Sequence, residues 1–346
     1  MSGTSLDGLD LCLCRFEQDN KAWRYTIIAT DTAAYPEDIK TKLASAQQMS
    51  ALELVRFHSE YGRYIGQAAK QFLATQSEKP ALIASHGHTI FHQPGEGFTF
   101  QIGSGAYIAV ASGIDTVCDF RTNDVAAGGQ GAPLVPIGDR HLFSQYDYCL
   151  NLGGFANISF EEQGLRLAYD ICPVNYVLNY YTRSTGMEYD NNGALAAKGA
   201  VYPELLEALN SLDFYRQQGP KSLGREWVEQ NIFPVIEHYK LSLEDKLTTF
   251  CEHIALQIGS KLKADTTMLV TGGGAFNTFL MSRIKAHSAA ILHIPDKLTV
   301  NFKEALIFAF LGRLYMESQP NCLASVTGAA IDVVGGALYK VVNDNL

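Results

Sequence analysis

Three glycine-rich segments constrain the fold of this chain more than any other feature, because each stands where a β-strand is expected to pass into a turn. They are residues 3–8 (GTSLDG), 151–159 (NLGGFANIS) and 271–277 (TGGGAFN). Glycine lets the backbone approach a ligand closely, and successive N–H groups in such turns can bind an anion. No lysine follows the glycines, so none of the three is a Walker A loop. Each turn alone is more often structural, but three along one chain favour nucleotide binding.

The elements around these turns follow a repeated order. Strand-like runs are expected near residues 9–14, 25–30, 81–85, 98–102, 115–119, 147–152, 155–160, 165–170 and 268–271. Helical patterns are expected near 36–48, 50–76 and, with Ser242 as the N-terminal cap, 243–263. The order of strands followed by helices restarts after the Gly-rich stretch at 126–131, and each copy carries a glycine-rich turn. This repeat predicts two related α/β halves around a cleft.

A length of 346 residues agrees with two domains. We expect the first domain to comprise residues 1–120 together with a C-terminal helix within 327–346, and the second to comprise residues 121–326. A helix over 327–343 is predicted because its apolar side chains form one stripe. These side chains are Ala329, Val333, Val334, Ala337, Leu338 and Val341.

Charge and cysteine content narrow the functional classes. The 27 Lys and Arg residues against 36 Asp and Glu residues give a net charge of −9, which would repel nucleic acid and anionic membrane surfaces. In a chain with this excess of acidic residues, we expect phosphate to be bound by backbone N–H groups and metal ions. The seven cysteines form no C-x-x-C pair and indicate free thiols in a reducing compartment. Without a signal-peptide pattern or a membrane-spanning run, the chain is expected to be cytoplasmic, with homodimer formation left open.

Six segments along nearly the whole chain carry a more specific resemblance. They are residues 3–10 (GTSLDGLD), 85–94 (SHGHTIFHQP), 119–136 (DFRTNDVAAGGQGAPLVP), 151–159 (NLGGFANIS), 220–226 (PKSLGRE) and 326–329 (VTGA). Together and in this order they resemble the anhydro-N-acetylmuramic acid kinases, and the block at 119–136 is the most specific. That family belongs to the superfamily of actin-like proteins, sugar kinases and heat-shock ATPases.

The resemblance implies two actin-like (ribonuclease H-like) α/β domains with ATP in the cleft between them. The first two glycine-rich loops would contact the phosphates and the third would lie near the adenosine. The implied nucleotide-binding residues are Gly3, Thr4, Ser5, Leu6, Asp7, Gly8, Leu9, Asp10, Gly153, Gly154, Asn157, Gly272, Gly273 and Gly274. No residue is expected to bind a metal directly: Mg²⁺ would arrive with ATP, and Asp7 could hold it through its water shell. The substrate-binding candidates are His88, Arg121, Asp124 and Gln130.

Asp170 stands between a strand pattern and a helix pattern, and Pro173 suits a first helical turn. Spacing alone leaves two interpretations, a helix cap or a catalytic carboxylate. The family's catalytic Asp lies in the corresponding segment, usually Asp-x-Gly-Pro-x-Asn. Asp170, Pro173 and Asn175 match that pattern, whereas Cys172 replaces the glycine. The resemblance therefore implies that Asp170 is the catalytic base.

The implied activity is an ATP-dependent kinase of amino-sugar metabolism. It would hydrolyse the 1,6-anhydro ring of 1,6-anhydro-N-acetylmuramic acid and phosphorylate O6, giving N-acetylmuramic acid 6-phosphate during peptidoglycan recycling. An anhydro sugar has no free 6-hydroxyl. Asp170 would therefore deprotonate a water that attacks the anomeric carbon, while the released O6 attacks the γ-phosphate.

Two other functional classes compete with the kinase. His86, His88 and His92 form an H-x-H-x₃-H array, which is typical of a metal-dependent hydrolase if one extended strand places His86 and His88 on the same face. A non-catalytic ATP-driven switch is the third class.

Structural roles are the simpler expectation for several other charged residues. Asp190 is expected to cap a helix, Glu304 to lie exposed on one, and Lys221, Arg225 and Glu226 to form a solvated helix start.

Overall fold

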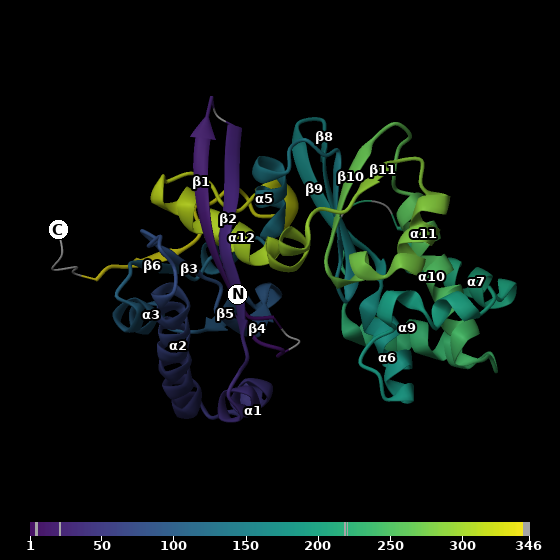
Figure 1. Ribbon diagram of the computed structural model, residues 1–346, viewed down its shortest axis with the longest axis horizontal. Helices are drawn as coiled ribbons and strands as arrows, with labels where there is room; N and C mark the ends of the chain where they lie inside the picture. The colour runs from purple at the N-terminus through teal and green to yellow at the C-terminus, as the bar shows by residue number, and fades with distance from the viewer. Residues whose placement is uncertain (4–5, 21, 218, 220, 342–346) are drawn as a thin grey trace. The chain divides into compact units, whose positions relative to one another are not determined.

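The computed structural model describes residues 1–3, 6–20, 22–217, 219 and 221–341. Strands and helices alternate in two α/β units (Figure 1), one of Met1–Leu142 with Phe302–Leu346 and one of Phe143–Asn301. The α/β class is thereby confirmed. The units divide at 142/143 and 301/302, whereas the sequence pattern had suggested 120/121 and 326/327. No helix in the described part of the chain is both long and apolar enough to cross a membrane.

A five-stranded mixed sheet forms the centre of the second unit. Its strands, in spatial order, are β11 (Ile291–His293), β10 (Thr267–Thr271), β7 (Tyr148–Leu152), β8 (Phe155–Glu162) and β9 (Leu165–Pro173). The strands β7, β8 and β9 form an antiparallel meander, while β10 runs parallel to both β7 and β11. This order and these directions are those of a ribonuclease H-like sheet. The strands β7, β8, β9 and β10 lie where strand-like runs were expected, whereas β11 was not predicted.

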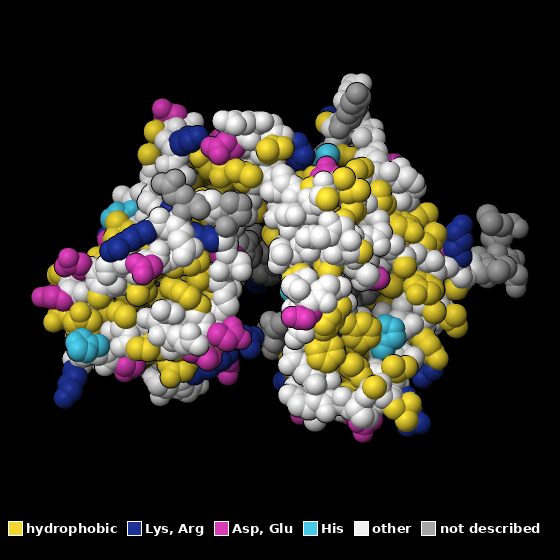
Figure 2. Space-filling view, turned by 180° about the vertical axis from the view of Figure 1, so that it is seen from behind, with side chains coloured by type: hydrophobic (Ala, Val, Ile, Leu, Met, Phe, Trp, Pro, Cys, Tyr) yellow, Lys and Arg dark blue, Asp and Glu magenta, His cyan; other side chains and the backbone are white. Residues whose placement is uncertain are grey.

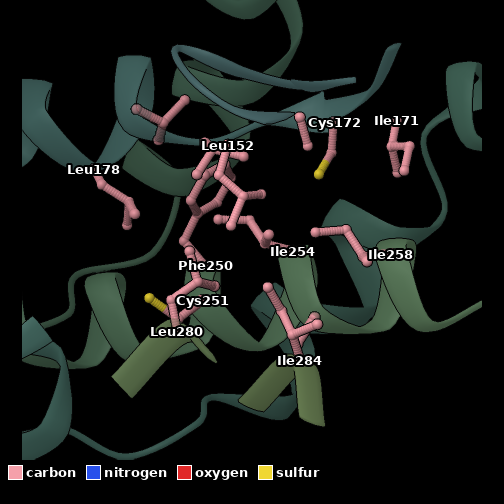
Figure 3. Packing of buried hydrophobic residues seen from close by; sticks show 14 of the residues in the cluster. Leu152, Ile171, Cys172, Leu178, Phe250, Cys251, Ile254, Ile258, Leu280 and Ile284 are labelled. Atoms are coloured by element: carbon pink, nitrogen blue, oxygen red, sulfur yellow. The ribbon is translucent and has the colours of Figure 1, made fainter. Parts of the chain in front are cut away.

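Helices join this sheet in the hydrophobic core of the second unit. They are α6 (Asn175–Thr182), α7 (Pro203–Asn210), α8 (Asp213–Arg216), α9 (Arg225–Glu237), α10 (Leu243–Gly259) and α11 (Thr278–His287). Of these helices, α10 contacts β9, and α7 packs on α10 and α9. The α10 helix begins as predicted, because the Ser242 side chain accepts a hydrogen bond from the Asp245 N–H. Its buried residues Phe250 and Ile254 lie between Leu152 of the sheet and Leu280 of α11 (Figure 3). This packing connects the sheet to α10 and α11 through one continuous core.

The first unit contains smaller sheets. Its strands are β1 (Leu9–Asp19), β2 (Ala22–Ala33), β3 (Ile83–Ser85), β4 (His88–Gln93), β5 (Phe98–Ile102), β6 (Thr116–Cys118) and β12 (Ala337–Tyr339). The runs expected near 9–14 and 25–30 are strands, and they pair as the antiparallel β1–β2 hairpin; β4 pairs with β5, and β3, β6 and β12 form a third sheet. A cavity of about 460 Å³ lies among residues of β1, β3 and the helices α2 (Ala51–Ala74) and α12 (Lys297–Met316).

The helices of the first unit are α1 (Glu37–Ser45), α2 (Ala51–Ala74), α3 (Gly105–Ser112), α4 (Thr122–Ala126), α5 (Val135–Leu142), most of α12 (Lys297–Met316) and α13 (Ala324–Thr327). Of these, α1 and α2 lie close to the helical patterns expected near 36–48 and 50–76, whereas α3, α4, α5 and α13 were not predicted. A capping box at Ser50 and Glu53 starts α2. On the face shown in Figure 2, the described Lys and Arg side chains stand singly among Asp and Glu side chains and form no continuous basic area.

The predicted C-terminal helix over 327–343 is wrong. Helix α13 ends at Thr327, Gly328 takes the left-handed conformation, and Ala337–Tyr339 form β12 antiparallel to β6. Gly335 and Gly336 explain the difference, since a Cβ at Gly335 would collide with the Phe120 carbonyl oxygen and Gly336 has a φ of +140°. Two glycines in a row disfavour a helix despite its apolar stripe. Residues 342–346 lie outside the described part of the chain.

Two of the family-specific segments meet in the first unit. Asp124 of the 119–136 block is fully buried, and its carboxylate accepts hydrogen bonds from the Thr327 hydroxyl and the Gly131 N–H, both at 2.7 Å. The Gln130 N–H also donates to the Thr327 carbonyl at 2.8 Å. Residues about two hundred positions apart in sequence are thus held together by one carboxylate.

We predict that Thr327→Val lowers the free energy of unfolding by about 1.5–3 kcal/mol, the usual contribution of a hydrogen bond to a charged group. The replacement keeps the shape of the side chain and leaves Asp124 with one partner fewer in a buried place. Chemical denaturation of the chain and of Thr41→Val, a control at an exposed position of α1, measures the difference. Equal stability of the two variants would contradict the structural role of Asp124.

Candidate active site

A row of polar side chains crosses the sheet of the second unit. In the register of the strands, Asn151 of β7 lies opposite Asn157 of β8, and Asn157 lies opposite Asp170 of β9. Cross-strand neighbours project from the same face of a sheet. A register shift between Ala156 and Asn157 marks a β-bulge next to Asp170, a feature that re-aims side chains near active sites. The sequence pattern did not single out Asn151, whose place in this row depends on strand register.

Asp170 is half-buried and is held on two sides by one segment of the chain. Its N–H donates to the carbonyl of Lys221 at 2.9 Å, and its Oδ2 accepts a hydrogen bond from the N–H of Leu223 at 2.8 Å. Burial raises the pKa of Asp170, and the bond from Leu223 partly offsets this rise. Within the described residues, Oδ1 has no hydrogen-bond partner. One oxygen is therefore fixed and the other is available to a ligand or a water.

Asp170 is not a helix cap. It lies inside β9, and the next helix, α6, begins at Asn175 with Val174 as N-cap and no side-chain capping bond. Pro173 is the last residue of β9 rather than part of a first helical turn, which corrects the expectation from spacing. The N–H groups at the start of α6 are satisfied by the carbonyls of Gly153 and Gly154.

The second and third glycine-rich turns pack together around the end of β7. A Cβ at Gly272 would lie 2.7 Å from Oδ1 of Asn151, and one at Gly274 would lie 2.7 Å from the Leu152 Cβ. The side-chain amide of Asn175 donates to the Leu152 carbonyl at 3.1 Å. The expected nucleotide-binding glycines at 153–154 and 272–274 therefore lie in one place, for which small residues are required.

The N–H groups of the second turn differ in their availability. The Gly153 N–H donates to the Phe155 carbonyl at 3.2 Å, so it is used inside the turn. The Gly154 N–H has no hydrogen-bond partner among the described residues, and a Cβ at this exposed glycine would approach nothing closer than the Tyr176 Cβ at 3.8 Å. Gly154 is thus free to meet a ligand.

The first glycine-rich loop belongs to the other unit. Asp7 is exposed, Gly8 and Leu9 are buried, and Leu9 belongs to the hydrophobic core. Oδ1 of Asp10 accepts a hydrogen bond from the Thr32 hydroxyl at 2.7 Å, and burial raises the pKa of Asp10.

The remaining residues expected in this loop differ in what the structure describes. Gly3 is half-buried, and its carbonyl accepts a hydrogen bond from the N–H of Leu6, whose φ is +55°. Thr4 and Ser5, also expected to bind nucleotide, lie outside the described residues.

The four substrate-binding candidates all lie in the first unit. Nε and Nη2 of Arg121 contact Nε2 of His86 at 3.1 and 2.9 Å, and its Nη1 donates to the Gly131 carbonyl at 2.6 Å. His88 is buried against Ser2, with Nδ1 2.8 Å from the Ser2 hydroxyl. The carboxylate of Asp124 is hydrogen-bonded to Thr327 and Gly131, as described above. Of the four candidates, only Gln130 has an exposed side chain.

The histidine array does not form a metal site. Gly87 has a φ of +70°, so β3 ends before His86 and β4 begins at His88, and the two imidazoles do not share one extended strand. Nδ1 of His92 is instead 3.0 Å from the Thr99 hydroxyl. The described residues contain no group of three or more His, Cys, Asp or Glu side chains able to hold a metal ion. The geometry of these histidines therefore gives the hydrolase alternative no support.

The charged residues expected to have structural roles fall into two groups. Asp190 is buried and precedes the short helix Asn191–Gly193, but its side chain makes no capping bond there; its two oxygens instead accept the N–H groups of Leu195 and Ala196, which is a structural role. Glu304 lies on α12 as expected and retains exposed surface, but its carboxyl is not a freely solvated one, because burial raises its pKa and the nearby Arg121 partly offsets the rise. Arg225 begins α9, as expected, but Lys221 is not freely solvated because its ammonium donates to carbonyls of the chain.

The chain closely resembles proteins of one family. A family model described as anhydro-N-acetylmuramic acid kinase matches residues 1–341. An "Anhydro-N-acetylmuramic acid kinase" of Pseudomonas syringae pv. syringae (strain B728a) is 37% identical over 362 residues, which cover 98% of this chain and 97% of that protein. Proteins of the same description from Pseudomonas paraeruginosa (strain DSM 24068 / PA7) and Variovorax paradoxus (strain S110) are 36% and 34% identical, each over 98% of this chain and 97% of that protein.

A solved structure shows a much weaker likeness. It is titled "Activator of the 2-Hydroxyisocaproyl-CoA Dehydratase from Clostridium difficile with bound ADPNP", with a TM-score of 0.32 and 14% identity over 53% of this chain and 67% of that one. A likeness this slight supports no conclusion about this chain.

The raised pKa of Asp170 generates a prediction about stability. An acid whose pKa is raised by folding destabilises the folded state at pH values above that raised pKa, because its charged form is less favourable there than in the unfolded chain. Asp170→Asn removes this charge and keeps an oxygen that can accept from Leu223. At pH 7 the variant is expected to be at least as stable as the unmodified chain.

Thermal unfolding of both proteins between pH 7 and pH 3.5 measures this effect. The advantage of Asp170→Asn should shrink as the pH falls through the raised pKa toward the ordinary value of 3.8. A variant that is less stable at pH 7, with a deficit that vanishes in acid, would show that the charged carboxylate stabilises the fold.

Proposed function

Because the chain belongs to the anhydro-N-acetylmuramic acid kinase family, we propose that it opens the 1,6-anhydro ring of 1,6-anhydro-N-acetylmuramic acid with water and transfers the γ-phosphoryl group of ATP to O6. The products are N-acetylmuramic acid 6-phosphate and ADP. The reaction returns a fragment of peptidoglycan to metabolism, and the seven free cysteines agree with a reducing, cytoplasmic setting.

The environment of Asp170 carries this proposal. A general base needs a carboxylate with an accessible oxygen and a pKa above that of an ordinary Asp. Asp170 has both properties, since burial raises its pKa and Leu223 occupies only one of its oxygens. Asn151 and Asn157 lie in the same row and offer hydrogen bonds to a sugar or a water beside it.

In the proposed reaction, Asp170 accepts a proton from a water molecule whose oxygen bonds to the anomeric carbon. The bond between that carbon and O6 breaks, and O6 bonds to the γ-phosphorus while ADP leaves. Transfer of the phosphoryl group neutralises the departing oxygen, so one carboxylate suffices where most glycosidases use two. Mg²⁺ supplied with ATP would offset the charge of the phosphates, and the exposed carboxylate of Asp7 suits a contact through its water shell.

The nucleotide would be bound mainly through backbone groups. Gly154 offers an available N–H and open space, and the glycines at 272–274 keep side chains out of the adjoining turn. The assignments in residues 3–10 and the substrate roles of His88, Arg121, Asp124 and Gln130 rest on the resemblance of their segments to the family.

Mass analysis of the product tests the proposed reaction. The chain is incubated with 1,6-anhydro-N-acetylmuramic acid, ATP and Mg²⁺. The product should be heavier than the sugar by one phosphoryl group and one water. A product heavier by the phosphoryl group alone would identify an ordinary sugar kinase.

Asp170→Asn is expected to reduce turnover by at least ~10²–10⁴-fold, the usual effect of losing a general base, with little change in the binding of ATP and sugar. Steady-state kinetics measure turnover, and calorimetric titration measures binding. The matched control is Asp190→Asn at another buried carboxylate: Asn can accept only one of the two N–H groups that Asp190 binds, so the variant should lose some stability but retain turnover within a few-fold. Turnover of Asp170→Asn close to that of the unmodified enzyme would refute the catalytic role.

Gly154→Val is expected to weaken ATP binding about tenfold or more, because the side chain would fill the space of a phosphate next to an available N–H. The structure offers this side chain room, with no atom within 3.4 Å of the new Cβ. Unfolding temperature therefore serves as the control, and it should change little. Unchanged ATP affinity in a folded variant would remove this turn from the nucleotide site.

A further inference from the structure

Residues 221–224, which precede α9, are described by the structure and form neither helix nor strand. This segment nevertheless makes the two hydrogen bonds that hold Asp170, one through the Lys221 carbonyl and one through the Leu223 N–H. Because β9 is the edge strand of the sheet, none of the strands that the structure describes lies on that side of Asp170 to fix it. The position of Asp170 therefore depends on how firmly this segment is anchored.

The Lys221 side chain provides that anchor. Its ammonium donates to the carbonyls of Phe214 and Gln217 at 2.8 and 3.2 Å and lies 4.1 Å from the centre of the Phe214 ring. Phe214 is buried and packs against Trp227 of α9, with ring centres 5.2 Å apart. A cation at the last carbonyls of a helix and over an aromatic face is doubly favourable. Lys221 thus holds its segment against the packed aromatic side chains of α8 and α9.

The ammonium group of Lys221 does not interact with the carboxylate of Asp170. The ammonium is directed to Phe214 and Gln217, and Lys221 forms no ion pair with Asp170. The shift of the Asp170 pKa has two causes, burial and the bond from Leu223, and neither is a neighbouring charge. A role for Lys221 at Asp170 therefore operates through the backbone of the segment.

We propose that Lys221 is a positioning residue for the reaction of Asp170. By holding the segment through Phe214, it keeps the Leu223 N–H on Oδ2 and leaves Oδ1 directed to the reacting water. This inference rests on the proposed function, and it extends that function to a residue that makes no contact with the acting oxygen.

The neighbouring titratable groups do not obscure a test by pH. Cys172 follows on β9 and Tyr215 lies on α8, and burial raises the pKa of both the thiol and the phenol. The pKa of Tyr169, beside Asp170 on β9, is also raised by burial. These groups remain neutral through the acid range in which Asp170 titrates.

Lys221→Met keeps the length of the side chain and removes the ammonium. Turnover should fall about 10–100-fold, as expected for a misplaced base, while the KM for ATP stays within about twofold. The acid limb of the profile of kcat/KM against pH should move to higher pH, since a weaker bond from Leu223 disfavours the charged form of Asp170. Lys221→Arg should restore most of the activity and the original profile, because Arg can also donate to carbonyls and lie over a ring.

The matched control is Lys246→Met. Lys246 also lies over an aromatic ring, 5.2 Å from the centre of Tyr181, and contacts Glu237 at 2.9 Å, but it does not hold the segment beside Asp170. Its variant should lose stability and keep the profile. The proposal would be overturned if Lys221→Met kept nearly full turnover and an unchanged profile of kcat/KM against pH. It would also be overturned if the acid limb of that profile moved equally in Lys221→Met and Lys246→Met.

A readout without catalysis separates this inference from the proposed function. The stability difference at pH 7 between Asp and Asn at position 170 should be larger in the Lys221→Met background, because the charged Asp170 is then less well satisfied. Additive effects of the two substitutions would overturn the positioning role even if the chain is a kinase. Absence of kinase activity together with clear coupling would contradict the proposed function and leave the contact established.

Discussion

Close packing around Leu152 is the constraint on which the candidate active site depends. This fully buried residue ends β7, and its carbonyl accepts the side chain of Asn175 at the start of α6. Its backbone and Cβ leave no room for side chains at Gly272 and Gly274. The second glycine-rich turn, the third one and the first turn of α6 are therefore fixed by one point of the sheet, and the nearby row from Asn151 to Asp170 is fixed with them.

The site combines a rigid sheet with one irregular segment. The sheet sets the place of the Asp170 backbone, while the segment from Lys221 to Leu223 sets the orientation of its carboxylate. A half-buried carboxylate with one unoccupied oxygen costs stability, and in enzymes such a cost is commonly maintained because it keeps a base reactive. The lysine that anchors the segment is itself held by carbonyls and an aromatic ring. Reactivity at one oxygen thus depends on contacts well away from it.

Local signals in the sequence predicted much of the fold. The strands at the centre of the second unit and the Ser242 cap follow from alternation and from capping chemistry, which involve neighbouring residues. The prediction of a C-terminal helix was wrong because it rested on an apolar stripe and gave too little weight to two adjacent glycines. The backbone conformations of these glycines decide the structure. The expectation that His86 and His88 share one strand was wrong for a similar reason, since Gly87 turns the chain between them.

The roles of individual site residues were harder to predict. Spacing left Asp170 as a cap or a base, and only the position of the strand relative to α6 excludes the cap. The role of Lys221 and the partnership of Asp124 with Thr327 depend on contacts between residues far apart in sequence. Local sequence patterns do not predict such contacts, so these roles could be recognised only in the structure.

The central claim is that water opens the anhydro ring while the sugar oxygen accepts the phosphoryl group. A single turnover in ¹⁸O-labelled water, quenched before the new anomeric hydroxyl exchanges, tests it most directly. The account predicts one labelled oxygen in the product, attached to the anomeric carbon, and none on phosphorus. Label on the phosphoryl group, or a phosphorylated product without label, would contradict it.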